Sequence, residues 1–195
     1  ISDCLVGSEM CIRDSLIMGP PGAGKGTQAK ILAQKFNLVH LSTGDILRKE
    51  IDRNSEVGLR AQTYMNAGNL VPDEVLLEMM NSTLTELKDN GVILDGFPRT
   101  IPQADGLSKI FQSLNQDIDA IINIEVDKDV LIRRLVERAK NSGRADDTEE
   151  VIVNRQNVYV ELTAPLIEFY QSNIIHVDGD GSIEEVTERI LKRIP

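Results

Sequence analysis

The feature that most constrains the fold is the stretch GPPGAGKGT at residues 19–27, which holds four glycines, two prolines and one lysine. An apolar, strand-like run precedes it at residues 16–18, and residues 28–36 are rich in helix formers. A strand, a glycine-rich turn and a helix in this order are typical of a phosphate-binding loop. Backbone N–H groups and the positive end of the helix then converge on one anion, and Lys25 is placed to reach the outer phosphates of a nucleoside triphosphate.

The position after Lys25 departs from the general pattern of such loops. A serine or threonine that binds Mg²⁺ usually stands there, whereas this chain has Gly26 and carries its hydroxyl one residue later, at Thr27. We expect Thr27 to contact a phosphate oxygen. Mg²⁺ would then be held by phosphates and water, with no direct protein ligand, because this ion gives up its waters reluctantly.

Length and composition restrict the class of protein. A chain of 195 residues with 41% hydrophobic residues predicts one domain with a sizeable core. The sequence has no apolar run long enough for a membrane span, and its net charge of −10 argues against a nucleic-acid partner. Its two cysteines, Cys4 and Cys11, cannot form a disulfide framework or a four-cysteine zinc site. We therefore expect a cytoplasmic protein.

Residues 1–15, ISDCLVGSEMCIRDS, do not fit the rest of the sequence. They show no regular hydrophobic period and no basic segment followed by an apolar one, so they do not resemble a signal peptide. A buried parallel strand normally has a longer apolar run than residues 16–18, and Arg13, Asp14 and Ser15 would have to extend it backwards. We expect residues 1–15 to be non-native or disordered and the domain to span residues 16–195. An organellar address stays open, since a native start can be missing.

Strand-like and helical segments alternate along the remaining sequence. The strands are expected at residues 16–18, 38–41, 91–95, 120–126 and 173–177, with helices between them. This order predicts an α/β fold with a doubly wound, five-stranded parallel sheet. His40 and His176 lie in strand-like runs and are expected to be structural. Because ligands bind at the carboxyl ends of parallel strands, the polar stretches at 19–27, 42–45, 95–99 and 178–181 should lie together.

Four motifs in order, GPPGAGKGT, LSTGD, LDGFPRT and SGRADD, make the chain closely resemble adenylate kinases, members of the nucleoside monophosphate kinase family. The resemblance runs from about residue 16 to the end. It implies a P-loop NTPase-type core, an AMP-binding insertion at residues 42–71 and a short lid at residues 139–149, with no structural zinc. It also implies a monomer that catalyses Mg²⁺-dependent transfer from ATP to AMP, giving two ADP and maintaining adenine nucleotide balance.

The resemblance assigns roles to individual positions. The ATP site would comprise Gly22, Ala23, Gly24, Lys25, Gly26, Thr27, Arg134, Arg138 and Gly181, with Arg134 against the adenine. The AMP site would comprise Thr43, Arg48, Leu70, Val71, Gly96, Arg99, Gln103, Arg144 and Arg155, with Thr43 and Gln103 facing the adenine. The catalytic groups would be Lys25, Arg99, Arg138, Arg144 and Arg155. Asp95 would order Mg²⁺-bound water together with Thr27, and Asp146 and Asp147 would act in the lid.

The choice of arginines has an independent physical reason. Phosphoryl transfer between two nucleotides brings two polyanions together, so catalysis depends on positioning and charge neutralisation. Guanidinium groups suit this task because they fork onto phosphate oxygens and keep their charge. Some of these residues have a structural alternative. Arg134 and Arg138 could form a solvated helix face, and Arg155 could pair with Glu150 or Glu161. The lid residues Asp146 and Asp147 could likewise belong to a solvated acidic loop.

Two other functions compete with this one. A UMP/CMP-type kinase would share the fold and the loop, but Thr43, Thr100 and Gln103 favour AMP, because pyrimidine-specific relatives tend to carry Ala and Asn at the first two positions. A non-catalytic nucleotide-binding module is the second alternative. Loss of Lys25 or of several arginines would indicate it, and the sequence keeps all of them.

Overall fold

The computed structural model describes residues 13–142 and 148–194. Its centre is a five-stranded sheet in the order β2-β3-β1-β4-β5, in which every pairing is parallel. The strands are β1 (Asp14–Met18), β2 (Val39–Ser42), β3 (Val92–Asp95), β4 (Ala120–Glu125) and β5 (Ile174–Asp178). This confirms the predicted doubly wound α/β fold, with the strand that leads into the glycine-rich loop at the middle of the sheet.

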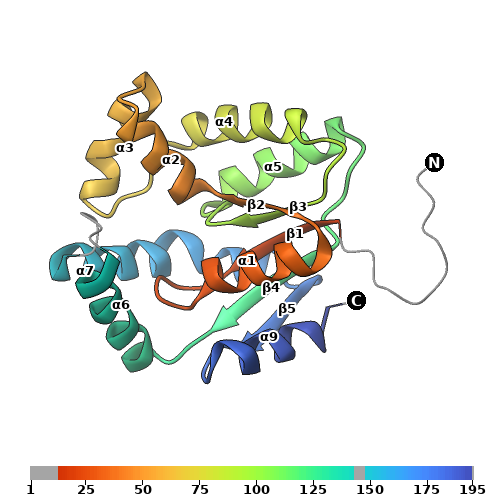
Figure 1. Cartoon of the computed structure of the whole chain (residues 1–195). Helices are drawn as coiled ribbons and strands as arrows, with labels where there is room; N and C mark the ends of the chain where they lie inside the picture. Colours follow the sequence, from red (N-terminus) through yellow and green to blue (C-terminus); the bar gives the residue numbers. More distant parts are fainter. Residues whose placement is uncertain (1–12, 143–147, 195) are drawn as a thin grey trace.

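Side chains that alternate along the strands build a separate core on each face of the sheet. On one face, Leu16 and Leu94 pack with α4 (Asp73–Glu86) and α5 (Ile101–Ser113). On the other face, Ile17 and Ile93 pack with α1 (Lys25–Phe36) and α9 (Ile183–Leu191). Figure 1 shows the two layers of helices with the sheet between them. Successive strand residues point to opposite faces, so both faces need apolar side chains.

A helical pair, α2 (Thr43–Asp52) and α3 (Glu56–Asn66), follows β2 and projects from one edge of the sheet. The side chains of Ser42 and Ser55 cap the two helices by accepting hydrogen bonds from Asp45 N and Gly58 N. The helices touch closely at Gly58, where an added Cβ would lie 2.2 Å from the carbonyl oxygen of Glu50. The pair falls within residues 42–71, the segment expected to form the AMP-binding insertion.

The helices after β4 flank the expected lid. α6 (Lys128–Ser142) extends over residues 139–142 of the expected lid and α7 (Glu149–Val158) begins at its last residue, while residues 143–147 lie outside the described part of the chain. The stretch 149–171 is divided into α7, a π-helix η1 (Tyr159–Thr163) and α8 (Leu166–Phe169). Proline lacks an N–H and crowds the preceding turn, and the wider turn, in which Ala164 N bonds to Tyr159 O, accommodates it.

The first strand begins earlier than expected. Asp14 and Ser15 are buried within β1, so residues 13–15 belong to the described structure, although the sequence placed them outside the domain. Asp14 is held on both sides: its Oδ1 accepts from Val92 N at 3.1 Å, and its own N–H donates to Asp119 Oδ2 at 2.9 Å. The expectation for residues 1–12 falls outside the described residues. Within the described ranges, no helix has the length and apolarity that crossing a bilayer requires.

Burial raises the pKa of Asp14 from 3.8 to about 6, against the opposing effects of the Val92 hydrogen bond and the Arg13 charge. The folded state therefore favours the protonated form, and stability falls as the pH rises from about 4 through about 6. Asp14→Asn keeps an acceptor for Val92 N but cannot ionise. We expect this variant to be more stable than the parent at pH 8, by about 1–3 kcal/mol, and equally stable at pH 4. Urea unfolding at the two pH values measures the difference, and parallel pH profiles for the two proteins would contradict the assignment.

Candidate active site

The glycine-rich loop joins the carboxyl end of β1 to the first turn of α1, as the sequence predicts. Gly19 has a positive φ of 138°, and a Cβ at this position would lie 2.5 Å from the carbonyl oxygen of Ile124 on β4. A side chain therefore cannot occupy the start of the loop. Gly24 is the N-terminal cap of α1 and carries no side-chain cap, so the first helical N–H groups face the loop. The loop and the helix end form a site for an anion.

Lys25 lies under this loop. Its Nζ donates to the carbonyl oxygens of Gly19 at 2.8 Å and Pro20 at 2.9 Å. Burial lowers the pKa of Lys25 from 10.5 to about 7; Asp95 opposes this shift, while the charges of Arg99, Arg155 and Arg138 strengthen it. An arriving phosphate would supply the negative charge that this group of cations attracts.

Asp95, at the end of β3, is the carboxylate that faces the loop. Burial by itself would raise the pKa of Asp95, but the hydrogen bond from His40 and the charge of Lys25 outweigh burial, and the net pKa lies below its usual value. His40 Nε2 is 3.4 Å from Asp95 Oδ2. His40 thus has a side-chain partner, as expected for a structural histidine, and that partner belongs to the site.

The distance between Asp95 and Gly26 gives a reason for the missing hydroxyl after Lys25. A Cβ at Gly26 would lie 3.2 Å from Asp95 Oδ2, so a serine or threonine would press on the carboxylate. Among the described residues, no group of three or more His, Cys, Asp or Glu side chains could hold a metal ion. Asp95 and the Thr27 hydroxyl both line a cavity beside the loop. A divalent ion that arrives bound to a polyphosphate could contact both of them there.

A cavity opens on the side of the loop that faces α2 and α3. It is bounded by the ends of β1 and β3, by residues 65–71 and by α7, and its wall combines apolar side chains with arginines. The residues of the predicted AMP set that line it are Thr43, Arg48, Leu70, Val71, Gly96, Arg99 and Arg155. Thr43 Oγ1 donates to Gly96 O at 2.9 Å and Arg99 Nε donates to the same oxygen at 2.7 Å. These bonds fix two of the side chains on the turn after β3.

Gln103 is not brought to this cavity. Its side chain is fully buried; Oε1 accepts from Arg99 N at 2.7 Å, and Nε2 donates to Asp73 Oδ1 at 2.7 Å. Asp73 also accepts from the hydroxyl of Thr100, which caps α5. In this arrangement its amide holds the Arg99 backbone to the start of α4, and the role expected for Gln103 beside the AMP adenine stays a prediction. Arg144, Asp146 and Asp147 fall outside the described residues.

A second cavity lies on the other side of the loop. All residues of the predicted ATP set line it: Gly22, Ala23, Gly24, Lys25, Gly26, Thr27, Arg134, Arg138 and Gly181. Arg134 donates from Nη2 to Gly179 O at 3.0 Å, and Arg134 and Arg138 are half-buried, whereas Arg133 is exposed. The alternative of a solvated basic face thus applies to Arg133 and not to the other two.

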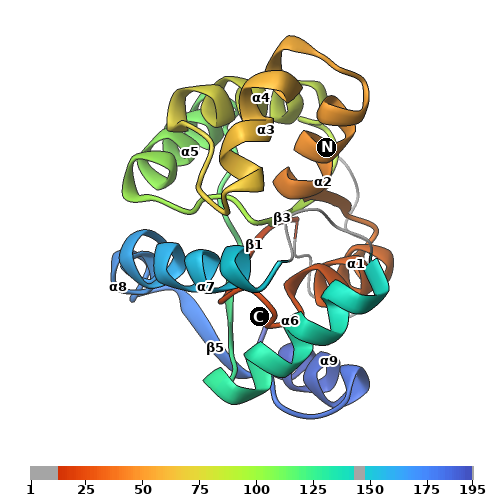
Figure 2. The same cartoon turned by 90° about the vertical axis from the view of Figure 1, so that its left-hand side faces the viewer.

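The two cavities meet at the cations. Lys25, Arg48, Arg99 and Arg155 line both of them. In Figure 2, which looks onto the carboxyl edge of the sheet, α2 and α3 lie on one side of the strand ends and α6 and α7 on the other. This arrangement can hold two phosphorylated molecules end to end, with their phosphates between the arginines.

Three amides that hold the site together were not predicted from the sequence. Gln156 donates to Pro21 O at 3.0 Å, Asn154 donates to Ala67 O at 2.7 Å, and Gln28 links α1 to α9 through Ile183 O at 3.0 Å. Asn154 and Gln156 flank Arg155, so α7 contacts both the loop and the end of α3. No motif or hydrophobic period distinguishes such amides from amides exposed to solvent. For Asn154 and Gln156, Arg155 between them is the nearby residue that points to a site.

Comparison with known proteins agrees with this geometry. Residues 17–175 match the family model described as adenylate kinase. The chain is 47% identical over 182 residues to an adenylate kinase of Leptospira biflexa, an alignment that covers 92% of this chain and 98% of that one. It is 49% identical over 179 residues to an adenylate kinase of Synechococcus sp. (strain CC9902), covering 91% and 96%, and 47% identical over 177 residues to one of Corynebacterium urealyticum, covering 90% and 96%.

The lowered pKa of Lys25 predicts proton uptake when a polyphosphate binds. Above pH 7 part of the free protein carries neutral Lys25, and a bound anion restores its charge by raising the pKa. Calorimetric titration with inorganic triphosphate at pH 8, in buffers of different ionisation enthalpy, should show about one more proton taken up per site by the parent than by a variant whose side chain stays charged. Lys25→Arg, which stays charged, should bind without this uptake. Equal proton uptake by the two proteins would contradict the assignment.

Proposed function

The chain belongs to the adenylate kinase family, and on this premise we propose that ATP binds in the cavity lined by residues 22–27 and AMP in the cavity beside α2 and α3. The enzyme transfers a phosphoryl group reversibly from ATP to AMP, giving two ADP. Members of this family use ATP as its Mg²⁺ complex. One observation carries the placement of the two nucleotides: the cavities share Lys25, Arg99 and Arg155, so two phosphate chains would meet there.

In the ATP site, the amides of residues 22–27 and the positive end of α1 bind the phosphates, with Lys25 at the outer ones. Thr27 contacts a phosphate oxygen. Arg134 lies against the adenine, a position that suits a planar cation, and Gly181 offers its backbone to the same base. Arg138 neutralises the phosphoryl group in transfer. All of these groups line one cavity, which supports the assignment.

Mg²⁺ fits this site as a companion of the phosphates. When bound, it would neutralise charge on the transferring group. Asp95 and Thr27 would hold its water, since Gly26 presents no side chain and a Cβ there would already lie 3.2 Å from Asp95 Oδ2. The proposal includes no structural zinc: the expected lid contains no cysteine, and Cys4 and Cys11 lie outside the described residues.

In the AMP site, Arg48 and Arg99 hold the phosphate, and Thr43, Leu70, Val71 and Gly96 surround the adenosine. Arg48 is already oriented by Asp45, whose Oδ1 lies 2.6 Å from Nη2. Arg155 stands between the two phosphate chains. Arg144 is proposed to reach the same point from the lid.

Catalysis then rests on positioning, charge neutralisation and exclusion of water. The arginines bring the AMP phosphate and the outer phosphate of ATP into line despite their mutual repulsion. Lys25 neutralises the charge of the phosphoryl group during transfer. We propose that the insertion at residues 42–71 and the lid at residues 139–149 close over both substrates, which keeps water from accepting the phosphoryl group. We further propose a monomer acting in the cytoplasm, in line with the resemblance.

Assay of ADP formation from ATP and Mg²⁺ with AMP, CMP or UMP as acceptor tests the function. We expect rapid turnover with AMP alone, and a loss of at least about a thousandfold in Lys25→Ala, because the charge at the transferring group disappears. Comparable turnover with CMP or UMP would favour a pyrimidine nucleotide kinase. Binding of both nucleotides without turnover would favour a non-catalytic module.

Arg48→Lys tests the AMP site separately. Lysine keeps the charge but loses the forked pair of donors, so we expect KM for AMP to rise about tenfold while KM for ATP stays within about twofold. The matched control is Arg133→Lys, the same change at an exposed arginine of α6, which should leave both constants unchanged. A rise in KM for ATP alone would contradict the proposed role of Arg48.

A further inference from the structure

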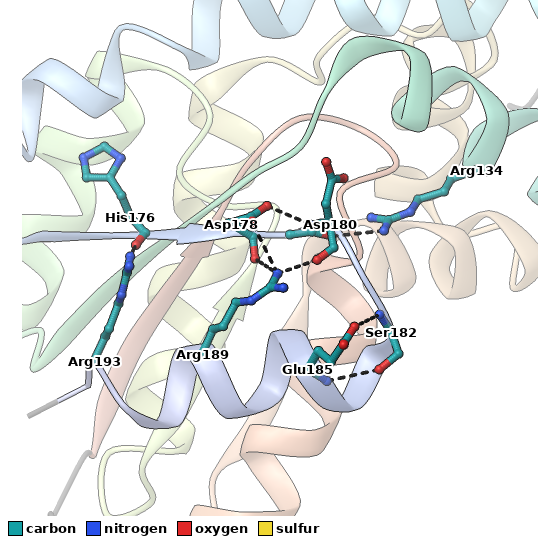
Figure 3. A network of polar contacts seen from close by, with 9 residues as sticks. Arg134, His176, Asp178, Asp180, Ser182, Glu185, Arg189 and Arg193 are labelled. Carbon is teal, nitrogen blue, oxygen red and sulfur yellow. Dashed lines mark hydrogen bonds and ion pairs between the residues drawn. The ribbon is translucent and has the colours of Figure 1, made fainter.

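The turn after β5, residues 178–181, is held by an arginine that lies outside both cavities. Arg189 on α9 donates from Nη1 to the carbonyl oxygen of Asp178 at 2.9 Å and to that of Asp180. The same atom lies 3.3 Å from the Asp178 carboxylate oxygen Oδ2. Figure 3 shows the guanidinium reaching up from α9 to the underside of the turn. One side chain thus engages three acceptors of the turn.

The opposite side of the turn is held by Arg134, which comes from α6 (Figure 3). Its Nη2 donates to Gly179 O, so the three consecutive carbonyl groups of residues 178, 179 and 180 are bound alternately by Arg189, Arg134 and Arg189. Gly179 N also donates to Glu125 O on β4 at 2.7 Å. The backbone just before Gly181, which lines the ATP cavity, is fixed from both sides.

The sequence of the turn explains why such support is needed. Residues 178–181 read DGDG, so two glycines make the backbone flexible and two aspartates repel each other. Asp178 Oδ1 accepts from Asp180 N at 3.0 Å, and beyond the turn Ser182 and Glu185 form the capping box of α9. Both ends are anchored, and the cation of Arg189 supplies the charge that holds the middle.

We propose that Arg189 is a positioning residue for the base of ATP: it acts through the turn, fixing the backbone of Gly181 and the carbonyl that orients Arg134. This inference rests on the proposed function, in which the adenine lies between Arg134 and Gly181. Arg189 itself touches neither the phosphate loop nor the AMP cavity, so its effect should fall on the base of ATP and spare the phosphates.

Arg189→Met tests the proposal, because methionine keeps an unbranched apolar stem and removes the charge. We expect Kd and KM for ATP to rise about five- to tenfold, with KM for AMP and kcat within about twofold. Binding of inorganic triphosphate, which has no base, should stay unchanged. Arg189→Lys should recover part of the loss, since an ammonium group is charged but binds fewer of the three acceptors at once.

The matched control is Arg193→Met. Arg193 follows α9 and donates to the carbonyl of His176, on β5 but before the turn, so its loss should leave ATP binding unaltered. A general loosening of α9 would instead weaken ATP and triphosphate binding alike in Arg189→Met, and this would overturn the inference. Unchanged ATP affinity in that variant would overturn it too. If the parent protein binds ATP no more tightly than triphosphate, the proposed placement of the adenine is wrong. That result would overturn the inference even if transfer from ATP to AMP is intact.

Discussion

The half-buried group of like charges around Lys25 is the feature on which the site depends. Burial and three arginines lower the pKa of Lys25 to about 7, and Asp95 is the group that opposes this shift. Such a cluster attracts polyanions, because partly desolvated cations gain more from an incoming negative charge than fully exposed ones do. In the proposed mechanism, two nucleotides with facing phosphates would supply that charge, and the arginines that bind them would stabilise the group passing between them.

The parallel sheet is what makes this cluster possible. β1 lies between β3 and β4, so the loop that leaves β1 passes Asp95 on one side and Ile124 on the other. Elements distant in the sequence then converge on the loop: Arg99 follows β3, Arg138 comes from α6, and Arg155 comes from α7. α7 binds the loop through Gln156 and the end of α3 through Asn154. α7 thereby contacts elements that border both cavities.

The sequence predicted the parts of this arrangement that depend on local pattern. One cavity is lined by the loop residues 22–27, Arg134 and Gly181. These residues come after β1, β4 and β5, which are neighbours in the sheet, and ligands bind at the carboxyl ends of parallel strands. The motifs indicate which residues at those strand ends belong to the site. The bond between Gln103 and Asp73 was not foreseen, since the two residues are thirty positions apart and no local pattern marks a buried amide. Asp14 was excluded from the fold because a buried carboxylate contradicts the apolar pattern of a central strand, and its support comes from Val92 and Asp119. Arg189 resembles any solvated helical arginine until the turn above it is seen.

The most direct test of the central claim, that two nucleotide cavities join at one cluster of cations, is competition binding with a dinucleotide in which five phosphates connect two adenosines. Its phosphate chain would lie across Lys25, Arg99 and Arg155 with one adenosine in each cavity. We expect one molecule bound per chain, displacement of both ATP and AMP, and affinity far above that of either nucleotide. Displacement of ATP while AMP remains bound would show that the cavities are separate and would contradict this claim.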